Sequence, residues 1–370
     1  MTHRIIRCGP DNPLRVVVVG AGSMGRQWLT TVTAAPETEL VGIADLDLAA
    51  ARRAAADLGR PGLPVGSDAV ALAAGTGAQA IVNVTVPEAH HPVTTAALFA
   101  GLPVLGEKPI ADTLAHALSL AAASEASGEL FMVSQSRRWN PQLFALRGML
   151  GELGAIGTLT TEFFKAPHFD GFRAEMAYPL LVDMAIHAFD AARFLLGADP
   201  VAVYCQAYNP PWSWYEGDAA ASAVFEMAGG ARYAYNGSWC SPGAETSWNG
   251  TWRASGEKGS VLWDGDSEPV LFADVQPAER PRSPYSDIAG ALRVFVESLR
   301  TGGVPMGEVH ENAMSLAMVE AAVSSARTGR RVLVDDVLDQ AYAAALRDEN
   351  RPDVRAALAG WQSVRGALVP

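Results

Sequence analysis

Short runs of β-branched residues alternate with alanine-rich stretches over the first third of the chain. The β-branched runs predict strands and the alanine-rich stretches predict helices. Glycine or proline marks the ends of the predicted helices. The predicted strands are residues 15–19, 39–44, 80–84, 103–105 and 130–133, and the predicted helices are residues 25–34, 48–58, 91–100 and 113–127. This order is typical of an α/β fold with a doubly wound parallel sheet and helices on both faces.

The hydrophobic pattern changes after about residue 135, where aromatic residues become frequent. Extended segments at 157–164, 201–207, 219–227 and 231–238 follow with few long helices between them, which predicts an open, mostly antiparallel sheet. Helical patterns return at 286–299, 311–328 and 337–346. The segment after Asp335 has an Ala/Leu/Arg pattern that predicts a helix packed on the body of the protein or on a neighbouring subunit.

Charge and composition exclude several classes of function. The formal net charge of -12 argues against nucleic acid as a partner, because phosphate binding needs a basic surface. Residues 69–87 form the longest uncharged stretch, but glycines and polar residues interrupt it, so a helix end, a turn and a buried strand are expected rather than a membrane span. Three widely spaced cysteines and a first apolar run of only four residues favour a cytoplasmic protein without a signal peptide.

A glycine motif follows the first predicted strand. The strand runs into Gly20-Ala21-Gly22-Ser23-Met24-Gly25 and then into a helix. Gly20 permits a tight turn, Gly22 lets the backbone approach a pyrophosphate, and Gly25 lets the helix pack close to the strand. The helix N-terminus presents unpaired N–H groups to the phosphates. The motif therefore predicts a dinucleotide site that includes Ser23 and Met24.

Asp45 ends the second predicted strand, about 20 residues after the glycines. A carboxylate at this position can accept hydrogen bonds from the adenosine ribose hydroxyls, which favours NAD(H) over NADP(H). Two alternatives stay open. Asp45 could instead cap the following helix, a role that Asp47 could also fill, and Arg52 and Arg53 keep a 2′-phosphate, and so NADP(H), in consideration.

A cation is expected at the carboxyl edge of the predicted parallel sheet. The predicted strand at 103–105 leads into Glu107-Lys108-Pro109, and ligands of doubly wound sheets bind at this edge. The preceding predicted strand leads into a second turn, Thr85-Val86-Pro87-Glu88-Ala89-His90-His91.

Together these motifs resemble the Gfo/Idh/MocA family, named for glucose-fructose oxidoreductase and inositol dehydrogenases. The resemblance includes Arg137-Arg138-Trp139-Asn140-Pro141 and the segment from Asp183 to Asp190. It implies a Rossmann domain at residues 1–136 that binds a nicotinamide cofactor. It also implies an α/β domain at residues 137–370 that binds substrate and forms a homodimer or homotetramer through its sheet. The cofactor contacts implied by the resemblance are Thr85, Val86, Pro87, His91, Glu107, Lys108 and Arg138.

The resemblance also identifies Lys108, Asp183 and His187 as catalytic and substrate-binding residues. Histidine titrates near neutral pH, so His187 suits the base that removes a hydroxyl proton. Lys108, as an ammonium group, would stabilise the developing alkoxide, and Asp183 would orient the substrate or the imidazole. Asp183 and His187 are four residues apart and would share one face of a helix. No metal is expected, because Lys108 supplies the polarisation.

The substrate is less well defined than the chemistry. The chain has Ala177-Tyr178-Pro179-Leu180 where the family usually has glycines, and Ala185 where it often has glycine, which puts the substrate in doubt. Trp139, Lys165, His168 and Arg173 are candidate substrate contacts, although the last three could equally be surface residues. Further tryptophans of the second domain either stack on sugar rings or fill a sheet core or subunit interface: Trp212, Trp214, Trp239, Trp248, Trp252 and Trp263.

The leading hypothesis is an NAD(H)-dependent oxidoreductase acting on a sugar, cyclitol or related polyol. One alternative is a non-catalytic NAD-binding sensor of the same fold. The other is a glycosidase that keeps NAD bound and oxidises its substrate transiently.

Overall fold

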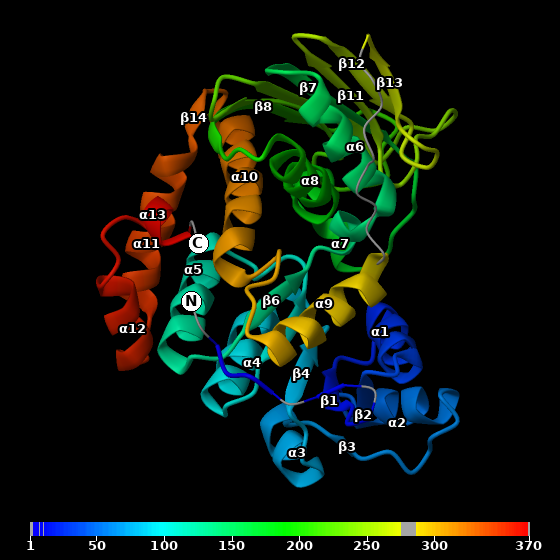
Figure 1. Cartoon of the computed structure of the whole chain (residues 1–370), viewed down its shortest axis with the longest axis vertical. Coiled ribbons are helices and arrows are strands. Elements are labelled where there is room, and N and C mark those ends of the chain that lie inside the picture. The colour runs from blue at the N-terminus through cyan, green and yellow to red at the C-terminus, as the bar shows by residue number, and fades with distance from the viewer. Residues whose placement is uncertain (1–2, 7, 10, 275–285, 369–370) are drawn as a thin grey trace. The chain divides into compact units, whose positions relative to one another are not determined.

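A computed structural model describes residues 3–6, 8–9, 11–274 and 286–368 of the chain (Figure 1). The chain forms two compact units. The first unit contains residues 1–136, 287–313 and 340–370, and the second contains residues 137–286 and 314–339. Two consecutive domains divided after residue 136 were expected. Residues 287–313 and 340–370 follow that division in sequence, yet they pack with the first unit.

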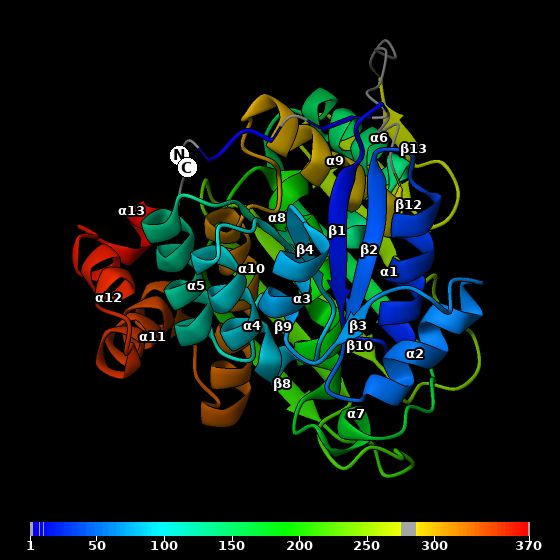
Figure 2. The same ribbon diagram turned by 90° about the horizontal axis from the view of Figure 1, so that it is seen from below.

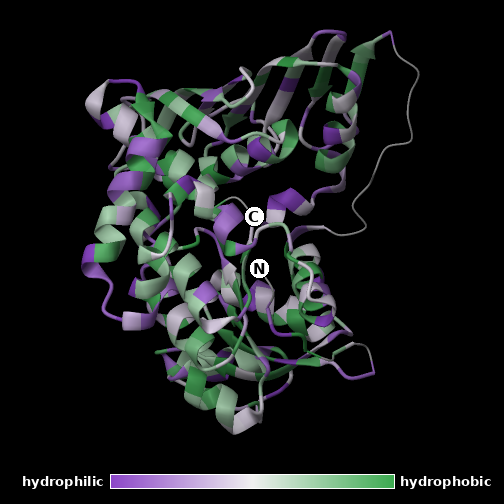
Figure 3. Ribbon diagram, turned by 60° about the vertical axis from the view of Figure 1, so that its left-hand side comes forward, coloured by the Kyte–Doolittle hydropathy of each residue, from purple (hydrophilic) through white to green (hydrophobic). Residues whose placement is uncertain are grey.

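The first unit is built on a six-stranded parallel sheet with the order β3-β2-β1-β4-β5-β6. The strands are β1 (Leu14–Val19), β2 (Thr38–Ala44), β3 (Val65–Gly66), β4 (Ala80–Asn83), β5 (Val104–Glu107) and β6 (Phe131–Ser134). Five of the six residues of β1 are buried, as expected of a strand covered on both faces. Figure 3 accordingly shows the strands of this sheet in the hydrophobic colour.

Helices cover both faces of this sheet. The helices that lie wholly in this unit are α1 (Ser23–Ala34), α2 (Leu48–Asp57), α3 (Ala69–Thr76), α4 (Pro87–Phe99), α5 (Leu114–Ser127), α9 (Asp287–Thr301), α12 (Pro352–Ala359) and α13 (Val364–Leu368). In Figure 2, α3, α4 and α5 lie to the left of β1, whereas α1 and α2 lie to its right. The doubly wound arrangement predicted from the sequence is therefore confirmed.

Local signals explain where these helices begin and end. Asp47, Asp68 and Thr113 cap α2, α3 and α5 by accepting backbone N–H bonds. The stretch 69–87 is α3, a turn and the buried strand β4, as predicted. The predicted start of the helix at residue 91 was wrong: α4 begins at Pro87, because proline fits the first turn of a helix, where its missing N–H is not needed.

The second unit is built on an eight-stranded sheet with the order β13-β12-β11-β7-β10-β9-β8-β14. The strands are β7 (Ile156–Phe164), β8 (Pro200–Tyr208), β9 (Ala220–Met227), β10 (Arg232–Ser238), β11 (Thr251–Gly256), β12 (Gly259–Trp263), β13 (Val270–Ala273) and β14 (Val332–Leu333). β7 and β10 pair in parallel and the other pairs are antiparallel, so the mostly antiparallel sheet is confirmed. The strands β11, β12, β13 and β14 were not predicted.

One face of this sheet is covered by helices of the same unit (Figure 1). The elements of the unit outside the sheet are the 3-10 turn η1 (Ser136–Trp139), α6 (Pro141–Glu152), α7 (Phe172–Glu175), the π-helical turn η2 (Leu180–Ala185), α8 (Ile186–Leu196) and the second part of α10 (Val309–Thr328). Phe189 of α8 packs edge-on against Phe225, Tyr233 and Tyr235 of the sheet. The core of the second unit therefore lies between α8 and the inner face of the sheet.

The structure assigns three of the six tryptophans of the second unit to its core and leaves the role of the other three open. Trp239, Trp252 and Trp263 are buried in the core of the second unit. Trp212 and Trp248 are exposed, and Trp214 is half-buried. The core therefore accounts for three of the six, and the exposed rings remain available to a ligand.

From residue 340 onward the C-terminal segment belongs to the first unit, so it packs on the body of the protein, as one of the two alternatives predicted. It continues from α11 (Val334–Asp348) into α12 and α13, and α12 lies against α5. No helix among the described residues is long and apolar enough to cross a membrane.

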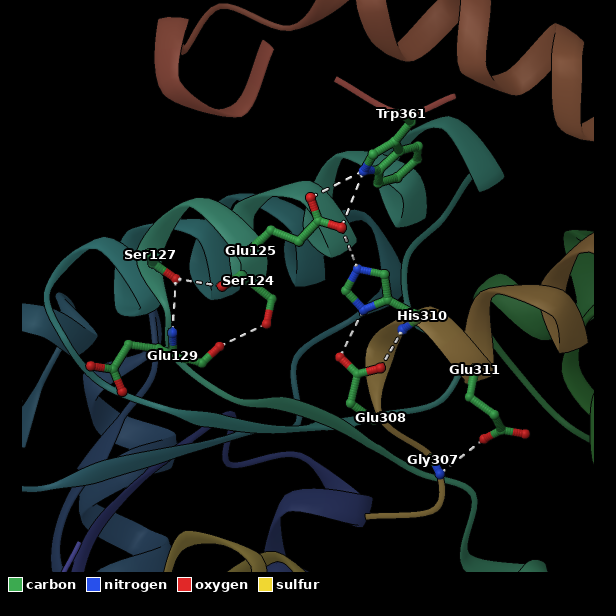
Figure 4. Close-up of polar contacts among 9 residues, drawn as sticks. All are labelled: Ser124, Glu125, Ser127, Glu129, Gly307, Glu308, His310, Glu311 and Trp361. Atoms are coloured by element: carbon green, nitrogen blue, oxygen red, sulfur yellow. Dashed lines mark hydrogen bonds and ion pairs between the residues drawn. The ribbon is translucent and has the colours of Figure 1, made fainter. Parts of the chain in front are cut away.

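A buried ionic cluster holds this segment in place (Figure 4). The His310 ring, 2% exposed, lies between two carboxylates: Nδ1 is 2.8 Å from Glu308 Oε1 and Nε2 is 3.0 Å from Glu125 Oε1. Trp361 in turn donates its indole N–H to the Glu125 carboxylate. Burial disfavours the charged ring, but its hydrogen bonds to Glu125 and Glu308 outweigh burial and raise the pKa of His310 to about 9.

Prediction for this cluster. The pKa of His310 in the folded chain lies above its ordinary value of 6.5. The ion pairs should therefore stabilise the fold fully below pH 6.5, by up to about 3 kcal/mol, and this contribution should be lost as the pH rises through 9. Urea unfolding of wild-type protein and His310→Gln at several pH values should show a stability difference that shrinks with rising pH. His116→Gln, at a half-exposed histidine, is the control. An unchanged difference between pH 6 and 10 would contradict the prediction.

Candidate functional site

The glycine motif forms the turn between β1 and α1, where two of its glycines lie in close contact with backbone atoms. Gly20 has φ +105°, and a Cβ there would lie 2.5 Å from the carbonyl oxygen of Val84. A Cβ on Gly25 would lie 2.1 Å from the carbonyl oxygen of Gly20. Both positions therefore require glycine. A Cβ on Gly22, by contrast, would meet nothing within 4 Å.

Asp45 lies beside this turn and does not cap α2. Its carboxylate accepts the N–H of Ala21 at 2.7 Å and the N–H of Asp47 at 2.8 Å. Asp47 is the cap of α2 and accepts the N–H groups of Ala49 and Ala50. Of the two residues considered for the cap, the structure thus assigns the role to Asp47. A carboxylate has four acceptor positions, so Asp45 retains capacity for hydroxyl donors.

The residues of this turn fit a dinucleotide. Gly22 is exposed, no side chain caps the N-terminus of α1 among the described residues, and Ser23 and Met24 begin the helix. The space above Gly22 and the N–H groups of the first helical turn suit a pyrophosphate. Leu46, which follows Asp45, is 90% exposed and offers an apolar surface beside the carboxylate.

The turn after β4 is held by a buried asparagine. Asn83, at the end of β4, accepts the backbone N–H of Thr85 at 3.3 Å and its hydroxyl at 2.8 Å. Its amide nitrogen donates to Thr94 in α4 at 3.1 Å. Val86 is 53% exposed, and Pro87 begins α4. The hydrogen bonds of Asn83 thus fix the turn, and the apolar side chain of Val86 stays exposed.

The turn after β5 carries Lys108 and is fixed through Glu107. The Glu107 carboxylate is buried, accepts the indole N–H of Trp28 in α1 at 2.8 Å, and accepts the backbone N–H of Lys108 at 3.1 Å. Lys108 itself is half-buried, and the peptide bond to Pro109 is cis. Glu107 therefore positions the Lys108 turn, and its predicted cofactor contact stays a prediction.

The two adjacent histidines of α4 lie in different surroundings. His91 is half-buried, 2.9 Å from the Ser119 hydroxyl of α5, and stacks on His116. Burial lowers the pKa of His91, and the nearby His116 lowers it further. His90, which was not predicted, is buried and lies between the carbonyl oxygens of Thr85 and Pro109. The contact of His91 with the cofactor remains a prediction.

In the second unit, Asp183 and His187 lie at a change of helix type. Asp183 is in the π-helical turn η2 and His187 is in the first turn of α8. Arg173 donates from Nε to Asp183 Oδ2 at 2.7 Å, so two predicted substrate-binding residues are brought together as an ion pair. π-helical turns of this kind are frequent at functional sites.

His187 lines a small cavity between α8 and the inner face of the sheet. The volume is about 20 Å³, which is room for about one water molecule. Arg137, Tyr235 and Trp248 are among the other lining residues. The Tyr235 hydroxyl is buried without a hydrogen-bond partner among the described residues, and burial raises the pKa of Tyr235. The cavity thus places a polar group of the sheet beside His187.

Lys165 and His168 each have a partner in the same unit. Lys165 donates to Glu245 at 2.9 Å and lies 5.1 Å from the Trp248 ring centre. His168 is exposed, and its ring stacks on Trp214 with 3.8 Å between centres. Their predicted substrate contacts are not tested by these interactions.

Arg138 and Trp139 are both buried in the second unit. Arg138 makes a bidentate ion pair with Asp190, which also accepts the Ser315 hydroxyl at 2.8 Å. Trp139 is 4% exposed and stacks against Phe144. The structure thus gives both residues packing roles, and the ligand contacts inferred from the resemblance stay predictions.

Sequence reasoning missed Trp28, Asn83 and His90, which lie under the turns. Each makes hydrogen bonds to a residue distant in sequence or to a backbone group, and no local motif marks them. Leu46 could have been found, because an apolar residue directly after a predicted ribose-binding carboxylate is visible in the sequence.

Comparison with known proteins gives consistent results along the chain. Residues 14–135 match the family model described as "Oxidoreductase family, NAD-binding Rossmann fold", and residues 147–262 match "GFO/IDH/MocA C-terminal domain". Inositol 2-dehydrogenase 4 of Saccharopolyspora erythraea is 34% identical over 52% of the chain and 57% of its own length. D-apiose dehydrogenase of Paraburkholderia graminis is 28% identical over 85% of the chain and 88% of its own length.

Among solved structures, an oxidoreductase from Agrobacterium radiobacter in complex with NAD+, L-tartaric acid and magnesium has the same fold. The TM-score is 0.76, with 21% identity over 88% of the chain and 99% of that structure. At this identity the likeness establishes the fold only.

Prediction for the glycine turn. Gly22→Val should keep wild-type stability, because a Cβ at this position meets no atom within 4 Å, but should abolish binding of NADH by filling the space for the pyrophosphate. Gly25→Ala should instead lower the free energy of unfolding by about 1–3 kcal/mol, because its Cβ collides with backbone. Urea unfolding and NADH fluorescence titration measure the two effects. Tight NADH binding by Gly22→Val would place the dinucleotide elsewhere.

Proposed function

Because the chain belongs to the Gfo/Idh/MocA family of NAD-binding oxidoreductases, we propose that it transfers a hydride between nicotinamide and a hydroxyl-bearing carbon of a polyhydroxylated small molecule. The observation that carries the proposal is the position of Lys108 at the carboxyl end of β5, where ligands of doubly wound sheets bind. In the sheet, β5 is the second strand from β1, which leads into the glycine turn. Glu107 and Trp28 fix the turn that carries Lys108.

The residues supply the acid–base chemistry. The nicotinamide, when bound, accepts or donates the hydride. His187 removes the hydroxyl proton during oxidation and returns it during reduction. The Lys108 ammonium group hydrogen-bonds the reacting oxygen and stabilises its negative charge. Asp183, whose carboxylate is held by Arg173, orients the substrate.

The cofactor in this proposal is NAD(H), in preference to NADP(H). Asp45 places a carboxylate beside the glycine turn, where it would accept ribose hydroxyls and repel a 2′-phosphate. Arg52 and Arg53 lie inside α2, one turn beyond its cap. Leu46 would cover one face of the adenine ring, since it is exposed next to Asp45.

A sugar, cyclitol or related polyol is the proposed substrate. The support comes from relatives named inositol 2-dehydrogenase and D-apiose dehydrogenase, and from exposed aromatic rings such as Trp248 that suit the C–H faces of sugars. We place this activity in the cytoplasm, where the free thiols Cys8, Cys205 and Cys240 would stay reduced.

Prediction for activity. Purified protein should form NADH from NAD and at least one member of a panel of sugars, inositols and sugar acids, followed by absorbance. Lys108→Ala and His187→Asn should each lower kcat/KM by about 10²–10⁴, because each removes a group that acts on the reacting oxygen. Tight NADH binding without turnover on any substrate would contradict the proposal and favour a sensor. Release of a sugar without net NADH would favour a glycosidase.

The outer face of the eight-stranded sheet supports a proposed homo-oligomer. Tyr204 of β8 lies opposite Val224 of β9, and Leu262 of β12 lies opposite Val270 of β13. All four side chains are exposed in the single chain. Cross-strand apolar pairs at both ends of an uncovered sheet face suit burial against a second copy.

Prediction for assembly. Wild-type protein should sediment as a dimer or tetramer. Tyr204→Asp combined with Val224→Asp should dissociate it, because two charges would be buried without partners. Val304→Asp, at a position 47% exposed outside this sheet, adds a charge away from the proposed interface and is the control. A monomeric wild-type protein at micromolar concentration, measured by sedimentation equilibrium, would refute the assembly.

A further inference from the structure

His90 connects the two turns at the carboxyl edges of β4 and β5. Its ring is 2% exposed, with Nδ1 2.7 Å from the Pro109 carbonyl oxygen and Nε2 3.0 Å from the Thr85 carbonyl oxygen. Pro109 directly follows Lys108, and Thr85 begins the turn that leads into α4. One rigid ring thus lies between the turn that carries Lys108 and its neighbour.

We propose that His90 is a positioning residue for Lys108, whose turn it fixes by donating a hydrogen bond to the carbonyl oxygen of Pro109, while its other ring nitrogen lies beside the carbonyl oxygen of Thr85. The inference rests on the role proposed for Lys108. The two ring nitrogens are a fixed distance apart, so the ring sets the separation of two backbone segments that have no strand pairing beyond Gly106.

The surroundings of the ring leave it little freedom. Asn83 donates to the His90 carbonyl oxygen and to Thr94, so the backbone of the same helical turn is held by β4. Glu107 holds the other side of the Lys108 turn through Trp28. His90 therefore supplies the contact on the Pro109 side, and the Lys108 backbone is fixed before and after the residue.

The protonation state of the ring is consistent with this role. Burial lowers the pKa of His90, so the ring is neutral at pH 7 and donates one N–H. We assign the N–H to Nδ1, because its 2.7 Å contact with the Pro109 carbonyl oxygen is the shorter of the two. Among the charged groups nearby, Glu88 raises this pKa and Lys108 lowers it.

The substitutions separate the two contacts. His90→Leu removes both. His90→Asn keeps a donor near the position of Nδ1 and so keeps the bond to Pro109, whereas His90→Gln places its donor near the position of Nε2, away from Pro109. Ala97→Gly, buried in the second half of α4, weakens the same helix without touching either turn and serves as the matched control.

Kinetics provide the first readout. His90→Leu should lower kcat by about 10- to 100-fold with little change in the Kd of NADH, because a small displacement of a reacting group is costly. His90→Asn should recover most of the loss and His90→Gln less. Equal losses in the Leu and Asn variants, or losses no greater than in Ala97→Gly, would overturn the proposal. If His90→Leu does not fold, the comparison of Asn with Gln decides.

A spectroscopic readout does not depend on turnover. The lysines of the chain are Lys108, Lys165 and Lys258, so reductive ¹³C-methylation gives few NMR signals, and Lys108→Arg assigns one of them. In His90→Leu the Lys108 signal or its titration midpoint should move while those of Lys165 and Lys258 do not. A Lys108 signal that coincides with wild type at every pH would overturn the proposal. Absence of turnover in wild-type protein would instead refute the proposed function. The NMR signal of Lys108 would then still test whether His90 positions this residue.

Discussion

The close backbone contact at the glycine turn between β1 and α1 is the constraint on which the arrangement of the first unit depends. Gly25 packs against the carbonyl oxygen of Gly20, and Gly20 packs against that of Val84, so α1, β1 and the end of β4 meet without intervening side chains. This contact aims the N-terminus of α1 over the sheet edge. It also places Trp28 of α1 where its indole reaches Glu107, and through it the backbone of Lys108.

In the second unit, buried ion pairs fix the helix that carries His187. Arg138 pairs with Asp190, Ser315 bridges Asp190 to Arg193, and Arg193 pairs with Asp199. The chain of contacts joins η1, α8 and α10 around the turn that holds His187. Removing one partner of such a buried pair costs about 3–5 kcal/mol, because the other charge is left uncompensated. The helix that carries His187 is therefore fixed by interactions outside the site itself.

Motifs with local physical causes could be predicted from the sequence, and tertiary contacts could not. The glycine turn, the strand ending at Asp45 and the Lys108 turn were predicted, because steric limits and sheet edges are marked within a few residues. The bridges from His90 to Pro109 and from Trp28 to Glu107 join separate elements, so periodicity does not reveal them. Strands β11, β12 and β13 were missed because their short segments are separated by glycine-rich turns. Residues 287–313 and 340–370 each follow a segment of the second unit in sequence but belong to the first unit, and no local pattern marks this return.

The discontinuous first unit has a consequence for biosynthesis. Its sheet is made early, yet α9, His310 and the helices that pack on α5 are translated after the whole sheet of the second unit except β14. Domains fold as units while the chain leaves the ribosome. The unit that begins first is therefore completed last, and α5 keeps an uncovered surface until α12 has emerged. During that interval the nascent chain exposes a surface of α5 that α12 covers in the finished protein.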